Sequence, residues 1–288
     1  MSKPLIVIVG PTASGKTALA MEIARRFNGE IICADSRTVY KGLDIGTAKP
    51  SAADRLAIPH HLLDVVTPNQ HFSAAEFKQL AERSIIDIRK RGKLPILVGG
   101  TGLYIDAVIF DYKFGAVADP GIRAELEKKT TKELQDICRE KNIKLPTNFN
   151  NRRHLIRAIE LGGLIKSPRV MISDTIVVGI SPTKEILSDR IRRRTKDMFD
   201  KNLLHEAQTI AAQYGWENEA MTGNIYQIAK QVLGKDIDVD TATEMVIKSD
   251  LNLAKRQMTW FRRNPAIQWS SDPQVLITKI DQFIASKK

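Results

Sequence analysis

The sequence predicts an α/β fold, in which a parallel sheet carries helices on both faces. Two observations support this prediction. Between Leu5 and Val98, short runs of Ile, Val and Leu alternate with stretches whose apolar residues have helical spacing, and this alternation is typical of parallel sheets that are covered on both sides. The first apolar run also leads through a glycine-rich segment, Gly10–Thr17, into a helical pattern.

The strands and helices of this core can be assigned in chain order. Five apolar runs are predicted to be strands: Leu5–Val9, Glu30–Ala34, His61–Val66, Leu94–Val98 and Thr175–Ile180. Helices are predicted between them, over Thr17–Phe27 and Phe72–Arg91. In the second helix, Ser73 followed by Glu76 fits a capping box, which marks where a helix begins.

A segment of different character separates the fourth and fifth strands. It contains two predicted helices, Pro120–Lys141 and Asn151–Leu161, and no strong strand. We therefore expect residues 113–174 to form a helical insertion domain and residues 1–112 and 175–288 to form the core. After the fifth strand all the sequence is predicted to be helical, including Lys184–Tyr214 and Thr241–Arg263.

Composition excludes several classes of protein. The 288 residues are 43% hydrophobic and 27% charged, which is ordinary for a globular protein and excludes a mostly disordered chain, a collagen-like fibre and a coiled coil. Leu5–Val9 is too short for a bilayer span or a signal-peptide core. We expect a cytoplasmic monomer with no membrane partner, in which Cys33 and Cys138 are two thiols without a disulfide.

A phosphate-binding loop follows the first strand. Its residues fit the pattern G-x-x-x-x-G-K-[ST], and the strand and helix that flank it are the context that this pattern requires. Backbone N–H groups of such a loop point at an anion, the lysine supplies a mobile positive charge, and the last hydroxyl is placed to bind Mg²⁺. We predict a P-loop NTPase-like core that binds a diphosphate or triphosphate through Gly10, Pro11, Thr12, Ala13, Ser14, Gly15, Lys16 and Thr17.

Two further segments lie where strands end, and ligands bind at the carboxyl ends of the strands in such sheets. Asp35 follows the second strand, and its position alone is compatible with a helix cap, a group near Mg²⁺ or a general base. Gly99–Tyr104 follows the fourth strand and includes Thr101. An ATPase that transfers phosphoryl groups often has Asp or Glu there, so its absence weakens that interpretation.

The charge balance favours a polyanionic partner. Lysine and arginine exceed the acidic residues by 11, and the pI is about 9.6, as is common for proteins that bind nucleic acid. Arg190 and Arg194 are four residues apart and share one helical face. They could stabilise charge on a leaving diphosphate, or they could be part of a solvated surface.

Taken together, these motifs resemble one family, the bacterial tRNA dimethylallyltransferases (tRNA isopentenyltransferases). The resemblance extends through nearly the whole chain. It is carried by Gly10–Thr17, Ala34–Ser36 with Val39 and Tyr40, Leu43–Pro50, Ile58–Asp64, Phe72–Ala75, Ile96–Ile105, Arg157–Glu160, Ala254–Gln257 and Thr259–Arg262.

The resemblance implies a prenyl transfer assisted by Mg²⁺, with Thr17 as a metal ligand. The dimethylallyl group of dimethylallyl diphosphate would go to N6 of adenosine 37, just 3′ of the anticodon, in tRNAs that read codons beginning with U. Asp35 would take the proton, while Thr101 and Arg194 would contact the diphosphate. The implied tRNA contacts are Asp35, Ser36, Arg37, Thr38, Thr101, Arg123, Arg153, His154, Leu155, Ile156 and Arg157.

Some positions depart from the family pattern, and two other functions stay open. Thr38 stands where Gln is often found, His154 where Arg is usual, and Asp250 where Thr is common. A P-loop nucleoside or small-molecule kinase would explain the loop and Asp35, but not the positive charge or the insertion. An RNA-binding homologue with impaired catalysis is the other alternative.

Overall fold

The computed structural model describes residues 3–115, 119–163 and 170–287. The chain divides into two compact units: Met1–Ile109 with Met171–Lys288, and Phe110–Val170. The second unit therefore starts and ends slightly earlier than the 113–174 that the sequence suggested. Each unit has its own buried apolar cluster.

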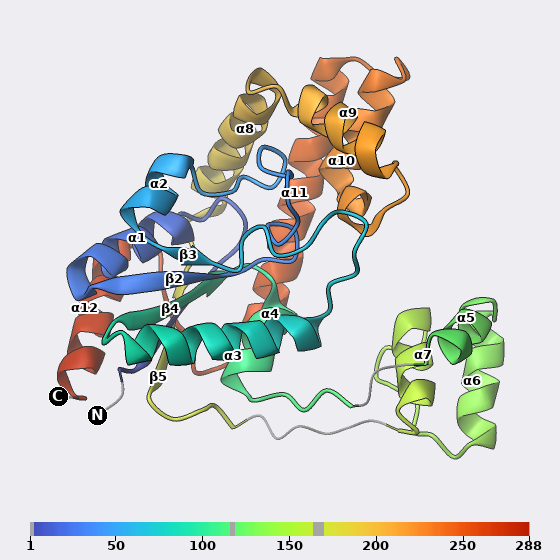
Figure 1. Ribbon diagram of the computed structural model, residues 1–288, viewed down its shortest axis with the longest axis horizontal. Helices are drawn as coiled ribbons and strands as arrows, with labels where there is room; N and C mark the ends of the chain where they lie inside the picture. Colours follow the sequence, from blue (N-terminus) through green and yellow to red (C-terminus); the bar gives the residue numbers. More distant parts are fainter. Residues whose placement is uncertain (1–2, 116–118, 164–169, 288) are drawn as a thin grey trace. The chain divides into compact units, whose positions relative to one another are not determined.

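The first unit is built on a parallel six-stranded sheet with the order β3-β2-β4-β1-β5-β6 (Figure 1). The strands are β1 Leu5–Val9, β2 Gly29–Ala34, β3 His60–His61, β4 Leu94–Gly99, β5 Thr175–Ile180 and β6 Gln268–Ser270. Because β1 lies between β4 and β5, the loop that follows it is at the middle of the sheet's carboxyl edge.

Strand residues alternate between the two faces of this sheet. Ile6 and Ile8 of β1 belong to the cluster formed with α1 (Lys16–Phe27) and α12 (Pro273–Ala285). The opposite face is covered by α3 (Ala74–Lys90) and α4 (Gly102–Ile109), and α3 passes in front of β4 in Figure 1. Phe77 of α3 stacks on Tyr104 of α4, with ring centroids 4.1 Å apart. The prediction of helices on both faces is confirmed.

The predicted third strand is largely wrong. Only His60–His61 pairs with β2, as β3, whereas Leu62 and Asp64 have positive φ angles of 64° and 55°. Left-handed residues interrupt the extended conformation that a strand requires. In the segment that follows, an isolated β-bridge pairs Tyr40 with Val66, and the backbone N–H groups of Val65 and Val66 donate to the carbonyl oxygen of Val39.

The C-terminal region contains more elements than the sequence indicated. The predicted helix over Lys184–Tyr214 is divided at Asn202, which has a φ of 75° and separates α8 from α9. The short strand β6 was not predicted, whereas helix α12 lies in the region that was expected to be helical. The helices here are α8 Lys184–Asp200, α9 Leu203–Tyr214, α10 Asn224–Leu233 and α11 Val239–Phe261, with a 3₁₀ turn over Glu219–Thr222.

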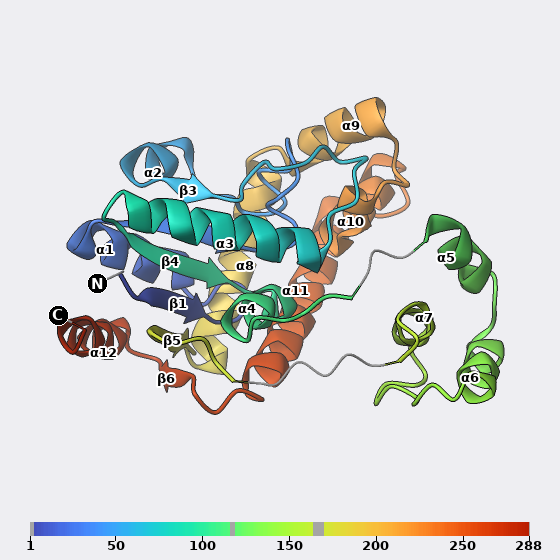
Figure 2. The same ribbon diagram turned by 60° about the horizontal axis from the view of Figure 1, so that its bottom comes forward.

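In its described residues the second unit has three helices, which are labelled in Figure 2 and enclose a small apolar core. They are α5 Pro120–Glu127, α6 Thr131–Glu140 and α7 Arg152–Glu160. The predicted helix Pro120–Lys141 is divided because Thr130 forms a capping box with Glu133 and starts α6 there. Within the described residues, no helix of either unit has both the length and the apolar character that crossing a membrane requires.

Candidate functional site

The loop after β1 leaves the start of α1 open to an anion. Gly15 is the residue before α1, and its φ of 97° is a left-handed conformation that favours glycine. No side chain caps this helix, whereas Ser73 caps α3. The first N–H groups of a helix need partners, and a phosphate can supply them. The geometry therefore fits the predicted phosphate cradle.

Lys16 lies half-buried at the base of this loop. Its Nζ donates a hydrogen bond to the carbonyl oxygen of Pro11 at 3.0 Å. Burial lowers the pKa of Lys16 from 10.5 to about 8; the negative charge of Asp35 opposes this shift, and the positive charge of Arg194 adds to it. A bound diphosphate would supply the negative charge that keeps Lys16 protonated.

A cavity of about 260 Å³ lies next to the loop, at the carboxyl ends of β2 and β4. Asp35, Lys16 and Arg194 all line it, although they come from three different parts of the chain. Its other walls are Thr12, Ala13, Ser14, Gly15, Thr17, Ala20, Ile31, Cys33, Thr38, Thr47, Ala48, Pro50, His60, Leu63, Val98 and Gly99. The cavity thus has both a charged part and apolar walls.

Asp35 directly follows β2, and Thr101 is hydrogen-bonded to the residue after it, Ser36. Asp35 Oδ1 accepts a hydrogen bond from the backbone N–H of Arg37 at 2.8 Å, and the Thr101 hydroxyl accepts one from the backbone N–H of Ser36 at 3.1 Å. Asp35 faces the cavity, whereas Thr101 is not among its walls. The structure therefore ties Thr101 to Ser36, the residue after Asp35, and Thr101 does not line the cavity.

The two arginines predicted to share a face of α8 both reach the loop. Arg190 donates to the carbonyl oxygen of Ser14 at 2.8 Å, and Arg194 donates to the hydroxyl of Thr12 at 2.6 Å. Arg192 and Arg193 instead form exposed ion pairs, with Glu244 and Asp189. Arg190 and Arg194 are therefore better interpreted as part of the phosphate-binding site. Arg192 and Arg193 are better interpreted as part of a solvated surface.

Sequence reasoning missed Gln257 as a site residue, although it lies in one of the motifs. Its Oε1 accepts the backbone N–H of Thr12 at 2.8 Å, and its Nε2 donates to the carbonyl oxygen of Gly100 at 3.1 Å. A glutamine of α11 thus joins the P-loop to the turn after β4. Helical spacing alone does not distinguish such a glutamine from one on the surface.

Four buried polar atoms that have no hydrogen-bond partner among the described residues belong to side chains that line the cavity. They are Ser14 Oγ, Thr38 Oγ1, His60 Nε2 and Arg194 Nε. His60 had no role in the sequence interpretation; its Nδ1 lies 2.7 Å from the carbonyl oxygen of Ile58. Buried polar atoms are normally paired, so these atoms are available to a bound molecule.

The tRNA contacts predicted for the second unit fall into three groups. The side chains of Leu155 and Ile156 lie in its apolar core, while Arg153 and His154 are exposed. Arg123 and Arg157 both bind Glu160, at 2.7 and 3.1 Å, and the Glu160 side chain is only 2% exposed. Arg153 and His154 are therefore the two that α7 presents to solvent. In the first unit, Arg37 donates to the carbonyl oxygen of Glu219 at 2.9 Å.

A parallel α/β sheet whose P-loop borders a cavity with a carboxylate and two cations defines a protein that binds phosphorylated ligands. Comparison with known sequences specifies the family. The family model described as IPP transferase matches residues 38–264, and the chain belongs to this family.

Relatives and solved structures match over almost the full length. The tRNA dimethylallyltransferase of Macrococcus caseolyticus is 37% identical and covers 98% of this chain and 95% of its own. The crystal structure of the full-length tRNA isopentenylpyrophosphate transferase of Bacillus halodurans has a TM-score of 0.75 at 35% identity, covering 99% and 96% of the two chains. The corresponding structure from Staphylococcus epidermidis has a TM-score of 0.75 at 36% identity, covering 99% and 100%.

Proposed function

We propose that this protein transfers the dimethylallyl group of dimethylallyl diphosphate to N6 of adenosine 37 in tRNAs that read codons beginning with U. One observation carries the proposal: Asp35 lines the same cavity as Lys16 and Arg194. A proton acceptor and two cations that bind a diphosphate are the groups that such a transfer needs. The relatives named tRNA dimethylallyltransferase support the same reaction.

In this reaction the bond between C1 of the prenyl group and the diphosphate oxygen breaks, and a bond between N6 and C1 forms. The N6 proton passes to the Asp35 carboxylate, and the diphosphate leaves with the bonding electron pair. Lys16, Arg194 and the N–H groups at the start of α1 stabilise the charge that develops on the leaving group. Thr101, hydrogen-bonded to Ser36, holds the backbone that carries Asp35.

The residues present fit Mg²⁺ as a partner of the diphosphate. Thr17 brings a hydroxyl to the cavity, and oxygen is the ligand that Mg²⁺ prefers. In the part of the chain that the structure describes, there is no cluster of three His, Cys, Asp or Glu side chains suited to a metal, so Thr17 would share the ion with diphosphate oxygens and water. When bound, the ion would neutralise charge on the diphosphate.

The target adenosine must leave the anticodon stack to reach Asp35. Positively charged side chains of the protein would bind the tRNA phosphates around it. Arg153 and His154 of α7 are exposed and suited to that contact. The excess of 11 basic residues supports a tRNA partner. Cytoplasmic location and a monomeric state stay predictions.

The direct test supplies the purified protein with Mg²⁺, dimethylallyl diphosphate and an unmodified anticodon stem-loop RNA. We expect mass spectrometry to find one added C5H8 unit on the adenosine 3′ of the anticodon. RNA that is bound but unmodified would contradict the proposed reaction and favour a homologue with impaired catalysis. Rapid ATP turnover with a small acceptor would favour a kinase.

A further inference from the structure

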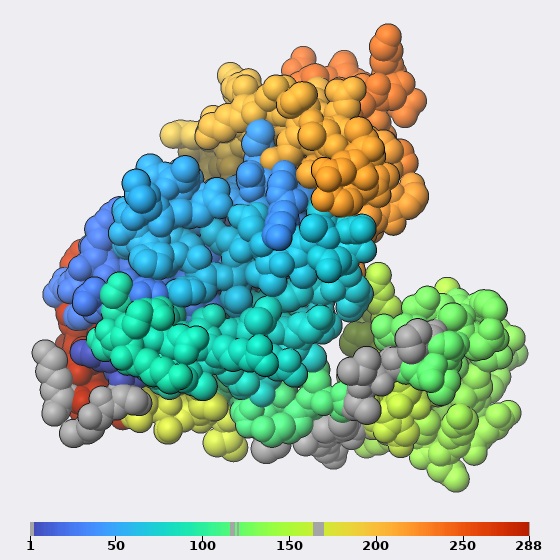
Figure 3. Space-filling model, viewed as in Figure 1, coloured from blue at the N-terminus to red at the C-terminus, as the bar shows by residue number. Residues whose placement is uncertain are grey.

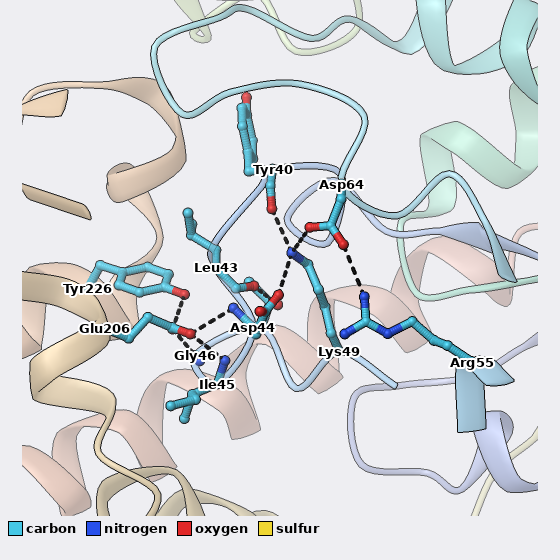
Figure 4. Close-up of polar contacts among 11 residues, drawn as sticks. Tyr40, Leu43, Asp44, Ile45, Gly46, Lys49, Arg55, Asp64, Glu206 and Tyr226 are labelled. Carbon is cyan, nitrogen blue, oxygen red and sulfur yellow. Dashed lines mark hydrogen bonds and ion pairs between the residues drawn. The ribbon is translucent and has the colours of Figure 1, made fainter. Parts of the chain in front are cut away.

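Glu206 of α9 binds the backbone of a loop that is far from it in the sequence. Its Oε2 accepts the N–H groups of Asp44 at 2.7 Å and Ile45 at 2.6 Å, and its Oε1 accepts that of Gly46 at 2.9 Å (Figure 4). The hydroxyl of Tyr226 in α10 donates to the same Oε1 at 2.9 Å. One carboxylate thus holds three consecutive amides.

The other end of this loop has an anchor of its own. Lys49, whose side chain is 1% exposed, donates to the carbonyl oxygen of Tyr40 at 2.6 Å and to the carboxylates of Asp44 at 2.8 Å and Asp64 at 2.5 Å. Arg55 binds the second oxygen of Asp64 at 3.1 Å. The segment between the two anchors is therefore fixed at both ends.

That segment forms a wall of the donor cavity. Thr47, Ala48 and Pro50 all line the cavity, and they begin directly after the last amide that Glu206 holds. Ala48 has a φ of 51°, a left-handed conformation that costs alanine about 1 kcal/mol or more. Two hydrogen bonds within the loop support this turn, from the N–H of Ala48 to the carbonyl oxygen of Ile45 and from the N–H of Lys49 to that of Asp44, both at 3.0 Å. The contacts of Glu206 and Lys49 then fix the turn against the rest of the unit.

The loop also fits closely against the helices that carry the anchor. A Cβ on Gly46 would lie 2.6 Å from the hydroxyl oxygen of Tyr226, so only glycine allows this approach. In the space-filling view the blue segment that contains the loop lies against the orange helices α9 and α10 (Figure 3). All these residues belong to the first unit.

We infer that Glu206 is a positioning residue that sets the affinity for the prenyl diphosphate, because it fixes the wall formed by Thr47, Ala48 and Pro50. Glu206 is not among the residues that line the cavity, and it acts through the backbone of the loop. The two carboxylate oxygens can accept hydrogen bonds from all three amides and from the Tyr226 hydroxyl. A glutamine would turn an NH₂ group toward backbone N–H groups and would lose part of the set. The inference rests on the proposed function, since it assigns the donor to this cavity.

The test compares Glu206→Gln with the matched variant Glu217→Gln, whose side chain is 93% exposed and pairs only with Lys230 among the described residues. We expect Glu206→Gln to raise both the KM and the calorimetric Kd for dimethylallyl diphosphate about tenfold, as for loss of one charged hydrogen bond. The kcat at saturating donor and the KM for tRNA should stay within about twofold. Glu217→Gln should change none of these values.

Two further measurements separate positioning from general stability. Tyr226→Phe removes one donor to Glu206 and leaves the three amides, so we expect a smaller rise in donor KM, about threefold. Hydrogen exchange at the amides of Asp44, Ile45 and Gly46 should speed up at least about tenfold in Glu206→Gln. The melting temperature of Tyr226→Phe should stay close to that of the unaltered protein.

Each contrary result overturns the inference. Unchanged exchange in Glu206→Gln would mean that Glu206 does not hold the loop, and faster exchange with unchanged donor Kd would mean that the loop does not affect the donor. A lower kcat, similar increases in the KM for the donor and the KM for tRNA, and a lower melting temperature would together indicate a general structural role. Failure of the unaltered protein to transfer a prenyl group would instead refute the proposed function, and the donor Kd would still decide the role of Glu206.

Discussion

Arg194 and Asp250 join α8 to α11 beside the phosphate-binding loop. The guanidinium of Arg194 donates one N–H to the carboxylate of Asp250 and another, at 2.6 Å, to the hydroxyl of Thr12. The two side chains are 26% and 19% exposed, so water screens the pair only in part. Asp250 therefore fixes the orientation of the Arg194 guanidinium beside the loop.

A double-mutant cycle tests this relationship. We expect Arg194→Ala to lower kcat by about 100-fold, because it removes a cation from the leaving group. Asp250→Ala should lower kcat/KM about fivefold, and the double variant should match Arg194→Ala, since Asp250 acts through Arg194. Steady-state kinetics would measure the four proteins, with Arg192→Ala as the surface control. Strictly additive losses would show that Asp250 acts independently.

The pKa of Lys16 predicts a pH dependence. At pH 7 a group whose pKa is about 8 is mostly protonated, and it loses its positive charge as the pH rises through that value. Because neutral lysine does not attract a diphosphate, kcat/KM for the donor should fall above pH 8. Lys16→Arg keeps the charge over this range and should remove the fall, while Lys16→Ala should raise the donor KM at all pH values. A fall of the same size in Lys16→Arg would assign it to another group.

Asp35 is predicted to carry the proton transfer. Asp35→Asn preserves size and can still accept the hydrogen bond from the Arg37 backbone, yet it removes the proton acceptor. We expect turnover to drop by about 10² to 10⁴, while the Kd for the anticodon stem-loop changes by less than about threefold. Single-turnover kinetics and a binding assay would measure the two effects. Turnover within tenfold of the unaltered protein would exclude Asp35 as the base.

The exposed part of α7 is predicted to contact tRNA phosphates. Arg153→Ala should reduce the slope of log Kd against log salt by about 0.7 to 0.9, the value for one phosphate contact. Arg26→Ala is a suitable control because Arg26 pairs with Asp281 near the far end of α1 from the P-loop. A titration of binding against salt concentration would measure the slope. An equal change in both variants would argue against a specific contact by Arg153.

The parts of the fold and site that were predictable have local signals. β1 and β5 are continuous apolar runs, and the P-loop has a defined pattern of glycines. The ranges of the two strands were therefore predicted correctly. β6 has only three residues, Gln268–Ser270, and pairs with a strand far away in the sequence. Such a short polar segment has no period from which a strand could be recognised.

The same reasoning explains why the anchors of the site were missed. Glu206 and Gln257 bind backbone groups of distant loops, and a backbone amide is present at almost every position. The side chains of those loops therefore do not indicate that Glu206 or Gln257 binds there. Asp35 and Lys16 were predictable because the ends of strands in a P-loop fold specify where they lie.

The position of β5 in the sheet has a consequence for synthesis of the chain. β1 pairs with β4 on one side and with β5 on the other, and the second unit is encoded between those two partners. A Cβ on Gly10 would meet the carbonyl oxygen of Ile180 at 2.7 Å, so β5 supplies part of the wall around the P-loop. A nascent chain that has reached only β4 therefore lacks this part of the wall. Because β5 follows the second unit in the sequence, the ribosome synthesises all of that unit before the surroundings of the P-loop are complete.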